Sequence, residues 1–208
     1  MHSRAMTPAV TAAILAGGRA TRLDGADKSS LVVSGARIIE RQLAALSGVA
    51  AEILMVSCRG DVEEQCAALG IPVIRDAVAG AGPLGGLCTA LESARHPWVL
   101  AVACDMPFVT SALFELLVSA IDEDVDAVVP RSSKGLEPLC AVYARRTARV
   151  FRRRLEAGQW RLGDVMTEVR VREIPRDALA GLDDDGRLFE NVNTPHDYAR
   201  AREVKQKR

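Results

Sequence analysis

The sequence predicts a three-layer α/β/α sandwich around a mostly parallel sheet. Over the first two thirds of the 208 residues, short apolar runs alternate with segments of helical periodicity, which is the pattern of linked β-α units. The run Trp98–Cys104 is apolar at every position, as in a central parallel strand that helices cover on both faces. Folds of this class bind ligands at the carboxyl ends of their strands.

Short runs of aliphatic and β-branched residues, bounded by turn residues, indicate the strands. They lie at residues 12–16, 31–33, 52–56, 71–74, 98–104, 125–129 and 139–143. Apolar residues spaced three or four positions apart indicate the helices between them. The helical segments contain Ile39, Leu43 and Leu46; residues 61–69; Leu84, Leu87 and Leu91; and Leu113, Leu116, Leu117 and Ile121.

Two helix starts carry capping residues. Thr110 precedes the fourth helical segment, where its hydroxyl can accept a bond from a first-turn N–H. Near the end of the chain, Thr194 is followed by Pro195, which suits the first helical position, and by Asp197, whose charge faces the positive helix end. No internal repeat or Pro/Ser-rich linker divides the chain. We therefore expect one domain at residues 11–208 after a disordered tail at 1–10.

Composition limits the classes of partner. Lys plus Arg and Asp plus Glu both number 27, a formal charge of zero, which argues against a nucleic-acid face or a polybasic membrane anchor. No apolar run reaches the ~20 residues of a membrane span, and the first residues lack the apolar core of a signal peptide. The five cysteines form no C-x-x-C pair, which indicates reduced thiols and a cytoplasmic protein.

The first expected strand leads into a glycine turn that is followed by two basic side chains. Gly17 and Gly18 lack a Cβ, so their backbone N–H groups can approach an anion. Arg22 and Lys28 add a planar guanidinium and a point charge. The P-loop pattern is absent. This combination of residues nevertheless favours a binding site for the phosphates of a nucleotide over a glycine turn flanked by solvated charges.

Two aspartates also follow expected strands. Asp76 comes after residues 71–74 and Asp105 after residues 98–104, so both are expected at the sheet edge that bears Gly17. Beside a phosphate loop, Asp105 suits Mg²⁺, which proteins bind through one or two carboxylates together with substrate phosphates. Asp76 is either an acceptor for the base or ribose of the nucleotide or a turn carboxylate.

Five motifs, in order over about residues 11–197, resemble those of the molybdenum cofactor guanylyltransferase family. Residues 15–28 resemble L-A-G-G-x-x-x-R-[LM]-x-x-x-D-K, and residues 103–107 resemble P-C-D-x-P with Ala103 in place of proline. Residues 76–87, 135–143 and 189–197 are similar to D-x-x-x-G-x-G-P-L-x-G-L, E-P-L-x-A-L-Y and F-x-N-x-N-T-P-E-D. The chain departs from the family at 57–59, where members often carry asparagines, so the base contacts are not transferred there.

The resemblance implies a Rossmann-like nucleotidyltransferase fold of the nucleotide-diphospho-sugar transferase type. It implies transfer of GMP from GTP to the terminal phosphate of molybdopterin, with or without molybdenum, and release of pyrophosphate. Mg²⁺ is the implied cofactor. We expect no nucleic-acid or membrane partner, a monomer or weak homo-oligomer, and transient contacts with cofactor-delivering proteins.

The resemblance also assigns roles to individual residues. The implied catalytic residues are Arg22, Lys28 and Asp105. The implied nucleotide contacts are Leu15, Ala16, Gly17, Gly18, Lys28, Asp76, Gly82, Pro83 and Asp105. The pterin side is assigned Glu137, Pro138 and Asn191, and the metal is assigned Asp105 and Asn193. Either asparagine can instead serve helix capping, which is the favoured interpretation for Asn191.

Three alternatives remain open. A nucleotidyltransferase of the same fold that uses CTP or a sugar phosphate shares the loop, although cytidylyl enzymes usually have Ala-Gly at Gly17-Gly18. Residues 80–85 fit G-x-G-x-x-G with Asp105 about 20 residues on, the fingerprint of a nicotinamide-binding oxidoreductase, although this turn does not follow the first strand. Loss of Lys28 or Asp105 would indicate a catalytically silent nucleotide-binding subunit, and both are present.

Overall fold

The structure is a computed structural model that describes residues 8–16, 31–57, 60–76, 78, 80–183 and 185–202. The strands are β1 (Val10–Leu15), β2 (Val32–Val33), β3 (Ala36–Arg37), β4 (Glu52–Ser57), β5 (Val73–Arg75), β6 (Trp98–Ala103), β7 (Ala127–Ser132), β8 (Gly135–Leu136), β9 (Cys140–Ala144) and β10 (Val171–Ile174). The α-helices are α1 (Ile38–Leu46), α2 (Gly60–Ala68), α3 (Gly82–Ser93), α4 (Ser111–Ser119), α5 (Ala148–Glu156), α6 (Leu162–Val165) and α7 (Pro195–Arg202). Two short 3₁₀ helices, η2 (Arg145–Thr147) and η3 (Arg176–Leu179), complete the described elements.

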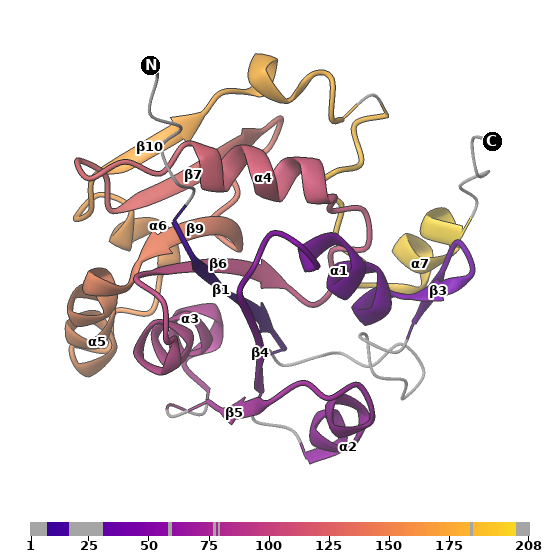
Figure 1. Ribbon diagram of the computed structural model, residues 1–208, viewed down its shortest axis with the longest axis horizontal. Coiled ribbons are helices and arrows are strands. Elements are labelled where there is room, and N and C mark those ends of the chain that lie inside the picture. Colours follow the sequence, from indigo (N-terminus) through magenta and orange to yellow (C-terminus); the bar gives the residue numbers. More distant parts are fainter. Residues whose placement is uncertain are drawn as a thin grey trace.

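The main sheet has the strand order β10-β7-β9-β6-β1-β4-β5, with β8 added beside β7 (Figure 1). β1 lies between β4 and β6 and is parallel to both, so that Leu15 pairs with Val56 on one side and Ala103 on the other. β9 runs antiparallel to β6 and β7. The mostly parallel sheet is therefore confirmed, and the carboxyl ends of β1, β4 and β6 lie side by side at one edge.

Alternate side chains of the strands enter two cores on opposite faces of the sheet. Along β1, Ala12 and Ile14 join the core that contains residues of α1, α2 and α4, whereas Ala13 and Leu15 join the core that contains residues of α3 and α5. In Figure 1, α3 and α5 accordingly lie on one side of the sheet and α1 and α4 on the other. The predicted three-layer sandwich is confirmed.

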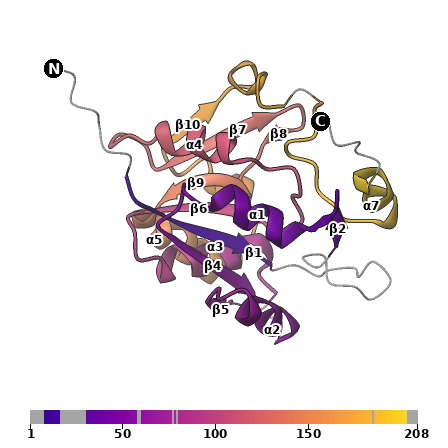
Figure 2. The same ribbon diagram turned by 45° about the vertical axis from the view of Figure 1, so that its right-hand side comes forward.

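A third, smaller core attaches the last helix to the carboxyl edge of the sheet. Its buried members are Leu31, Val33, Ile38, Val192 and Ala201, with Phe108 and Tyr198 packed against them. This core brings together β2, the start of α1, the segment before α7 and the segment after β6. Figure 2 shows α7 beside β2, so residues from both ends of the sequence meet at this edge.

The expected helix caps are present. The Thr110 hydroxyl accepts a bond from the Leu113 N–H at 3.3 Å at the start of α4. At the start of α7, the Asp197 N–H donates to Thr194 Oγ1 at 3.1 Å, and the Thr194 N–H donates to Asp197 Oδ2 at 2.9 Å. The expected N-terminal tail is too long, because Val10 is fully buried as the first residue of β1.

The described cysteines behave largely as predicted. Cys88 and Cys140 are buried free thiols, Cys66 is buried and Cys104 is half-buried, whereas Cys58 lies outside the described residues. Burial raises the pKa of the Cys88 thiol to about 12, so this thiol is protonated at neutral pH. In the part of the chain that the structure describes, no helix is long and apolar enough to cross a membrane.

Asp126 fastens the start of β7 to the segments that precede β10 and follow β9. Its carboxylate accepts bonds from Arg146 Nε at 2.8 Å and from Arg170 Nε at 2.9 Å. The Arg170 hydrogen bond is the largest cause that holds the pKa of this carboxyl well below its usual range, against the effect of burial. The carboxylate therefore stabilises the fold above its unfolded pKa, and this stabilisation is lost as the pH falls through the folded pKa.

Asp126→Asn should lower the free energy of unfolding at pH 7 by roughly 1.5 kcal/mol, the low end for hydrogen bonds to a charged group because both guanidinium groups are substantially exposed. The difference from wild type should shrink progressively below about pH 4. Urea unfolding across pH 7 to 3 measures this. The exposed neighbour Asp124→Asn is the control, and a difference that is equal at both ends of the range would contradict the assignment.

Candidate functional site

The carboxyl end of β1 is held between its two neighbouring strands. The Ala16 N–H donates to Val56 O at 2.8 Å, and the Cys104 N–H donates to Leu15 O at 3.1 Å. Asp105, the next residue after Cys104, therefore lies next to the place where the chain leaves β1 for the glycine turn. Four predicted site residues lie outside the described residues: Gly17, Gly18, Arg22 and Lys28.

The Asp105 carboxylate is half-buried and is held by the segment that precedes α7. Asn191 Nδ2 donates to Asp105 Oδ1 at 3.0 Å, and the Val192 N–H donates to the Asp105 carbonyl at 2.9 Å. The capping role favoured for Asn191 is thus wrong, because its side chain lies on Asp105 and Thr194 caps the helix. Asn193 is exposed, with its backbone N–H bonded to Asp197 Oδ2 at 3.2 Å, and its role as a metal ligand stays a prediction.

Helix α1 holds the same turn from the other side. The side chain of Gln42 is fully buried, and its Nε2 donates to Ala103 O at 2.7 Å and to Met106 O at 3.0 Å. Arg41 Nε donates to Pro107 O at 2.9 Å. The sequence analysis did not single out Gln42, although it lies four positions from both Ile38 and Leu46 on the buried face of α1.

Asp76 is a turn carboxylate in this structure. Its Oδ1 accepts bonds from the Val78 N–H at 3.2 Å and from the Thr89 hydroxyl at 3.1 Å. A Cβ at Gly85 would lie 3.3 Å from this oxygen, so a glycine there leaves room for the carboxylate. The structural role accounts for one carboxylate oxygen, and a bond from the nucleotide to the other stays a prediction.

Gly82 and Pro83 begin α3 at the same sheet edge. Gly82 has φ +63°, a left-handed conformation that suits glycine, and Pro83 fits the first helical turn, where its missing N–H removes no helix bond. Because α3 follows β5 rather than β1, residues 80–85 do not occupy the position of the dinucleotide fingerprint. The nicotinamide interpretation of this pattern is therefore not supported.

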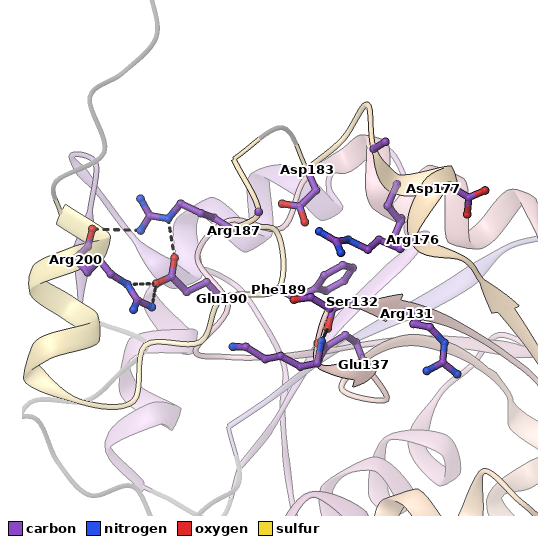
Figure 3. A pocket seen from close by; sticks show the side chains of 15 residues that line it. Arg131, Ser132, Glu137, Arg176, Asp177, Asp183, Arg187, Phe189, Glu190 and Arg200 are labelled. Carbon is purple, nitrogen blue, oxygen red and sulfur yellow. Dashed lines mark hydrogen bonds and ion pairs between the residues drawn. The ribbon is translucent and has the colours of Figure 1, made fainter.

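A cavity of about 1160 Å³ opens between the region of the β7–β8 hairpin and the segment that leads to α7. It is lined by Arg131, Ser132, Ser133, Lys134, Glu137, Arg176, Asp177, Leu179, Ala180, Asp183, Gly186, Arg187, Phe189, Glu190 and Arg200. Figure 3 shows Glu137 and Ser132 on one wall, Arg176 and Asp183 on another, and Glu190 with its two arginines at one end. Both charge signs therefore face the same space.

Glu137 and Pro138 lie where the β7–β8 hairpin meets β9. Burial raises the pKa of the half-buried Glu137 carboxyl, although a hydrogen bond from Ser132 and the charge of Lys134 oppose the rise. The Pro138 carbonyl accepts a bond from the fully buried Tyr143 hydroxyl at 2.6 Å. The wall that carries Glu137 is thus tied firmly to the sheet.

Glu190 holds the other end of the cavity together. Its Oε2 accepts a bond from Arg187 Nε at 2.6 Å and its Oε1 accepts one from Arg200 Nε at 2.7 Å (Figure 3). Burial raises the pKa of this carboxyl, but the hydrogen bonds from the two arginines outweigh that effect and lower it. The Arg187 guanidinium also lies 4.2 Å from the centre of the Phe108 ring. Asn191, whose side chain donates to Asp105, directly follows Glu190, so the backbone links this end of the cavity to the Asp105 contact.

The fold and the site together define a class of protein. In the sequence, the central strand β1 is followed by glycines and basic residues of the types that bind phosphates, and in the structure a carboxylate stands at the end of the neighbouring parallel strand. This is the arrangement of a nucleotidyltransferase, in which phosphates are positioned and their charge is neutralised at the strand ends. The profile of the MobA-like NTP transferase domain matches residues 12–171. The chain belongs to the MobA-like NTP transferase family.

Individual relatives are similar to this chain over nearly its whole length. A probable molybdenum cofactor guanylyltransferase from Pelotomaculum thermopropionicum is 38% identical over 92% of this chain and 91% of its own length. The molybdenum cofactor guanylyltransferase from Desulfosudis oleivorans is 32% identical over 93% and 94% of the two chains. Molybdopterin-guanine dinucleotide biosynthesis protein A from Archaeoglobus fulgidus superimposes with a TM-score of 0.78 at 28% identity, covering 93% and 97%.

The same architecture extends to a more distant enzyme. A 4-diphosphocytidyl-2C-methyl-D-erythritol synthase from Anaerococcus prevotii superimposes with a TM-score of 0.71 at 14% identity, covering 94% of this chain and 95% of its own. At that identity the similarity concerns the fold alone. The predicted nucleotidyltransferase fold is therefore confirmed.

Proposed function

We propose that the protein transfers GMP from GTP to the terminal phosphate of molybdopterin, forming molybdopterin guanine dinucleotide and pyrophosphate. The relatives that are 32–38% identical over more than nine tenths of the chain are named for this activity. The structural observation that carries the proposal is the position of Asp105. It stands immediately after the residue bonded to the end of β1, and the phosphate-binding loop begins there in the sequence. The proposal includes a cytoplasmic monomer or weak homo-oligomer with transient contacts to cofactor-delivering proteins.

The reaction suits a site that positions charge rather than moves protons. The attacking phosphate is already ionised at neutral pH, so no general base is required. The reaction needs in-line placement of the acceptor and neutralisation of charge on the α-phosphate and the departing pyrophosphate. Arg22, Lys28 and the Gly17–Gly18 amides are assigned to that neutralisation.

Asp105 fits the divalent cation that the proposal includes, which we take to be Mg²⁺. Within the described residues, no group of three or more His, Cys, Asp or Glu side chains gathers as a metal cage. Mg²⁺ does not need one, because it is bound through one or two carboxylates while phosphates and waters supply its other ligands. When bound, the cation would neutralise phosphate charge. Asp105 would hold it, Asn191 would orient Asp105, and Asn193 is the further candidate ligand.

The acceptor is assigned to the cavity between the region of the β7–β8 hairpin and the segment that leads to α7. Arg187 and Arg200 lie at the end that adjoins Asn191, and Lys134 and Arg176 line the remainder, so the cavity can hold an anionic molecule. The Glu137 carboxylate faces the same space (Figure 3) and can accept N–H bonds from an aminopyrimidinone ring such as that of a pterin. This supports the pterin side predicted for Glu137, whereas the same role for Pro138 and Asn191 stays a prediction.

The acceptor assignment is tested by pyrophosphate release with GTP and Mg²⁺ and a choice of phosphorylated acceptors. Release should require molybdopterin and should not occur with hexose 1-phosphates. Turnover with a sugar phosphate but not with molybdopterin would replace the proposal by the sugar-nucleotide alternative.

Arg22→Ala and Lys28→Ala should each lower kcat more than they raise KM for GTP. The physical reason is that negative charge develops on the departing pyrophosphate, so the two cations stabilise the transition state more than bound GTP. Steady-state kinetics at saturating molybdopterin measures both constants. A rise in KM with unchanged kcat for both variants would make these residues binding groups only.

A further inference from the structure

Gln42 is a fully buried polar side chain that donates hydrogen bonds to the backbone on both sides of Asp105. Its amide nitrogen donates to the carbonyls of Ala103 and Met106, which lie on either side of Asp105 in the turn after β6. Its Oε1 has no hydrogen-bond partner in the described part of the chain. The orientation of the amide is well determined, because exchanging its oxygen and nitrogen would place Oε1 against two carbonyl oxygens.

Packing alone does not explain a glutamine at this position. A buried polar atom without a partner costs about 1–3 kcal/mol, and the neighbours of Gln42 on the buried face of α1 include Ile38, Ile39 and Leu46. An apolar side chain of similar volume would avoid that cost, although it would also remove the bond donated to the Met106 carbonyl. Residues that break a local rule of stability tend to serve the site that they adjoin, and the site that Gln42 adjoins is the Asp105 turn.

The turn is held from two sides by different parts of the sequence. α1 contributes Gln42, and the segment before α7 contributes Asn191 and the Val192 N–H. α1 is also tied to Leu31, the residue before β2, because the Ile38 N–H donates to Leu31 O at 3.0 Å. In Figures 1 and 2, α1 lies beside β1 and β6 toward the side that carries α7.

We propose that Gln42 is a positioning residue that fixes the 103–106 turn so that the Asp105 carboxylate is placed for a divalent cation. The inference rests on the proposed function for the identity of the reaction, but the placement of Asp105 can be measured without it. Gln42 does not touch a reacting atom. It acts through the backbone on both sides of Asp105, and support of this kind around a metal ligand typically changes metal affinity by 10- to 100-fold.

Gln42→Met tests positioning at similar side-chain volume: it removes the unpaired Oε1 together with both donated bonds. The Ala103 carbonyl keeps its bond from the Met106 N–H, whereas the Met106 carbonyl loses the bond from Gln42. We expect the unfolding temperature to fall by no more than a few degrees, since loss of the unpaired Oε1 partly offsets loss of the two donated bonds. We expect Mn²⁺ binding in the presence of GTP, followed by electron paramagnetic resonance, to weaken about tenfold. The half-saturating Mg²⁺ for turnover should rise by a similar factor.

A function-independent readout is amide hydrogen exchange at Val192, whose N–H is bonded to the Asp105 carbonyl. Exchange there should become about tenfold faster in Gln42→Met as the turn loosens. The matched control is Thr147→Val in η2. It also removes a buried side-chain hydrogen bond to a backbone carbonyl, here from the Thr147 hydroxyl to Ala144 O at 2.7 Å. This control should leave Mn²⁺ binding and Val192 exchange unchanged.

The measurements on Gln42→Met decide between a positioning role and a purely structural role for Gln42. Wild-type Mn²⁺ affinity and wild-type exchange in Gln42→Met would overturn the proposal, and so would a variant that does not fold, because Gln42 would then be a structural brace. If wild type binds Mn²⁺ but transfers no GMP, the proposed function fails. Weakened Mn²⁺ binding in the variant would then still support the positioning role.

Discussion

Asp105→Ala is expected to remove nearly all turnover and to leave the fold intact. The side chain is half-buried at the sheet edge and belongs to none of the apolar cores, so its removal creates no cavity in the interior. What is lost is the negative charge that stands beside the end of β1. A variant that keeps more than about a tenth of wild-type kcat, a loss below ~1.4 kcal/mol, would show that Asp105 is not the principal metal ligand.

A second variant separates the charge of Asp105 from its hydrogen bond. Asp105→Asn keeps the shape of the side chain and an oxygen that can accept from Asn191, but it removes the carboxylate. It should lose nearly as much kcat as the alanine variant if the charge is what matters. Asp164→Ala, at an exposed carboxylate of α6, is the control for loss of an acidic side chain, and thermal unfolding of all three variants checks the fold.

Much of the fold could be predicted because the central strands have a simple pattern. Residues 98–103 are apolar throughout and fully or nearly fully buried in β6, as parallel strands between two helical layers require. The elements that were missed have few buried apolar residues. α5 is rich in arginine and buries only Phe151 and Leu155. β10 contributes four residues at the sheet edge and buries only Ile174.

The candidate site could be predicted only where a residue follows a strand directly. Asp105 was found in this way, because strand ends converge in a parallel sheet. The contacts that hold it were not, since Gln42 and Asn191 come from distant segments that only the tertiary fold brings to the turn. A polar residue on the apolar stripe of α1 was a usable signal for Gln42. The Glu190–Arg187–Arg200 cluster gave no comparable signal in a chain rich in arginine.

The structure narrows the backbone groups that can read the base of the nucleotide. The sequence places Leu15, Ala16 and Gly17 among the nucleotide contacts, and a peptide N–H and C=O there could read the edge of a purine base. The Ala16 N–H is bonded to Val56 O and the Leu15 carbonyl accepts from Cys104, so both groups are used within the sheet. Leu15 itself is 6% exposed. We therefore expect the base to be read by the Ala16 carbonyl and by an N–H of the segment that begins at Gly17, which lies outside the described residues.

GTP is expected to exceed ATP in kcat/KM by about 10⁴-fold, because a site that hydrogen-bonds a polar edge strongly rejects a mismatched one. A backbone carbonyl can accept from guanine N1–H while an N–H donates to O6, and adenine reverses both groups. CTP should also be poor, since a pyrimidine leaves part of the space unfilled. ITP is the matched control because it keeps O6 and N1–H, so it should approach GTP. Comparable kcat/KM for GTP and CTP would contradict the guanine assignment and leave a nucleotidyltransferase of different base preference.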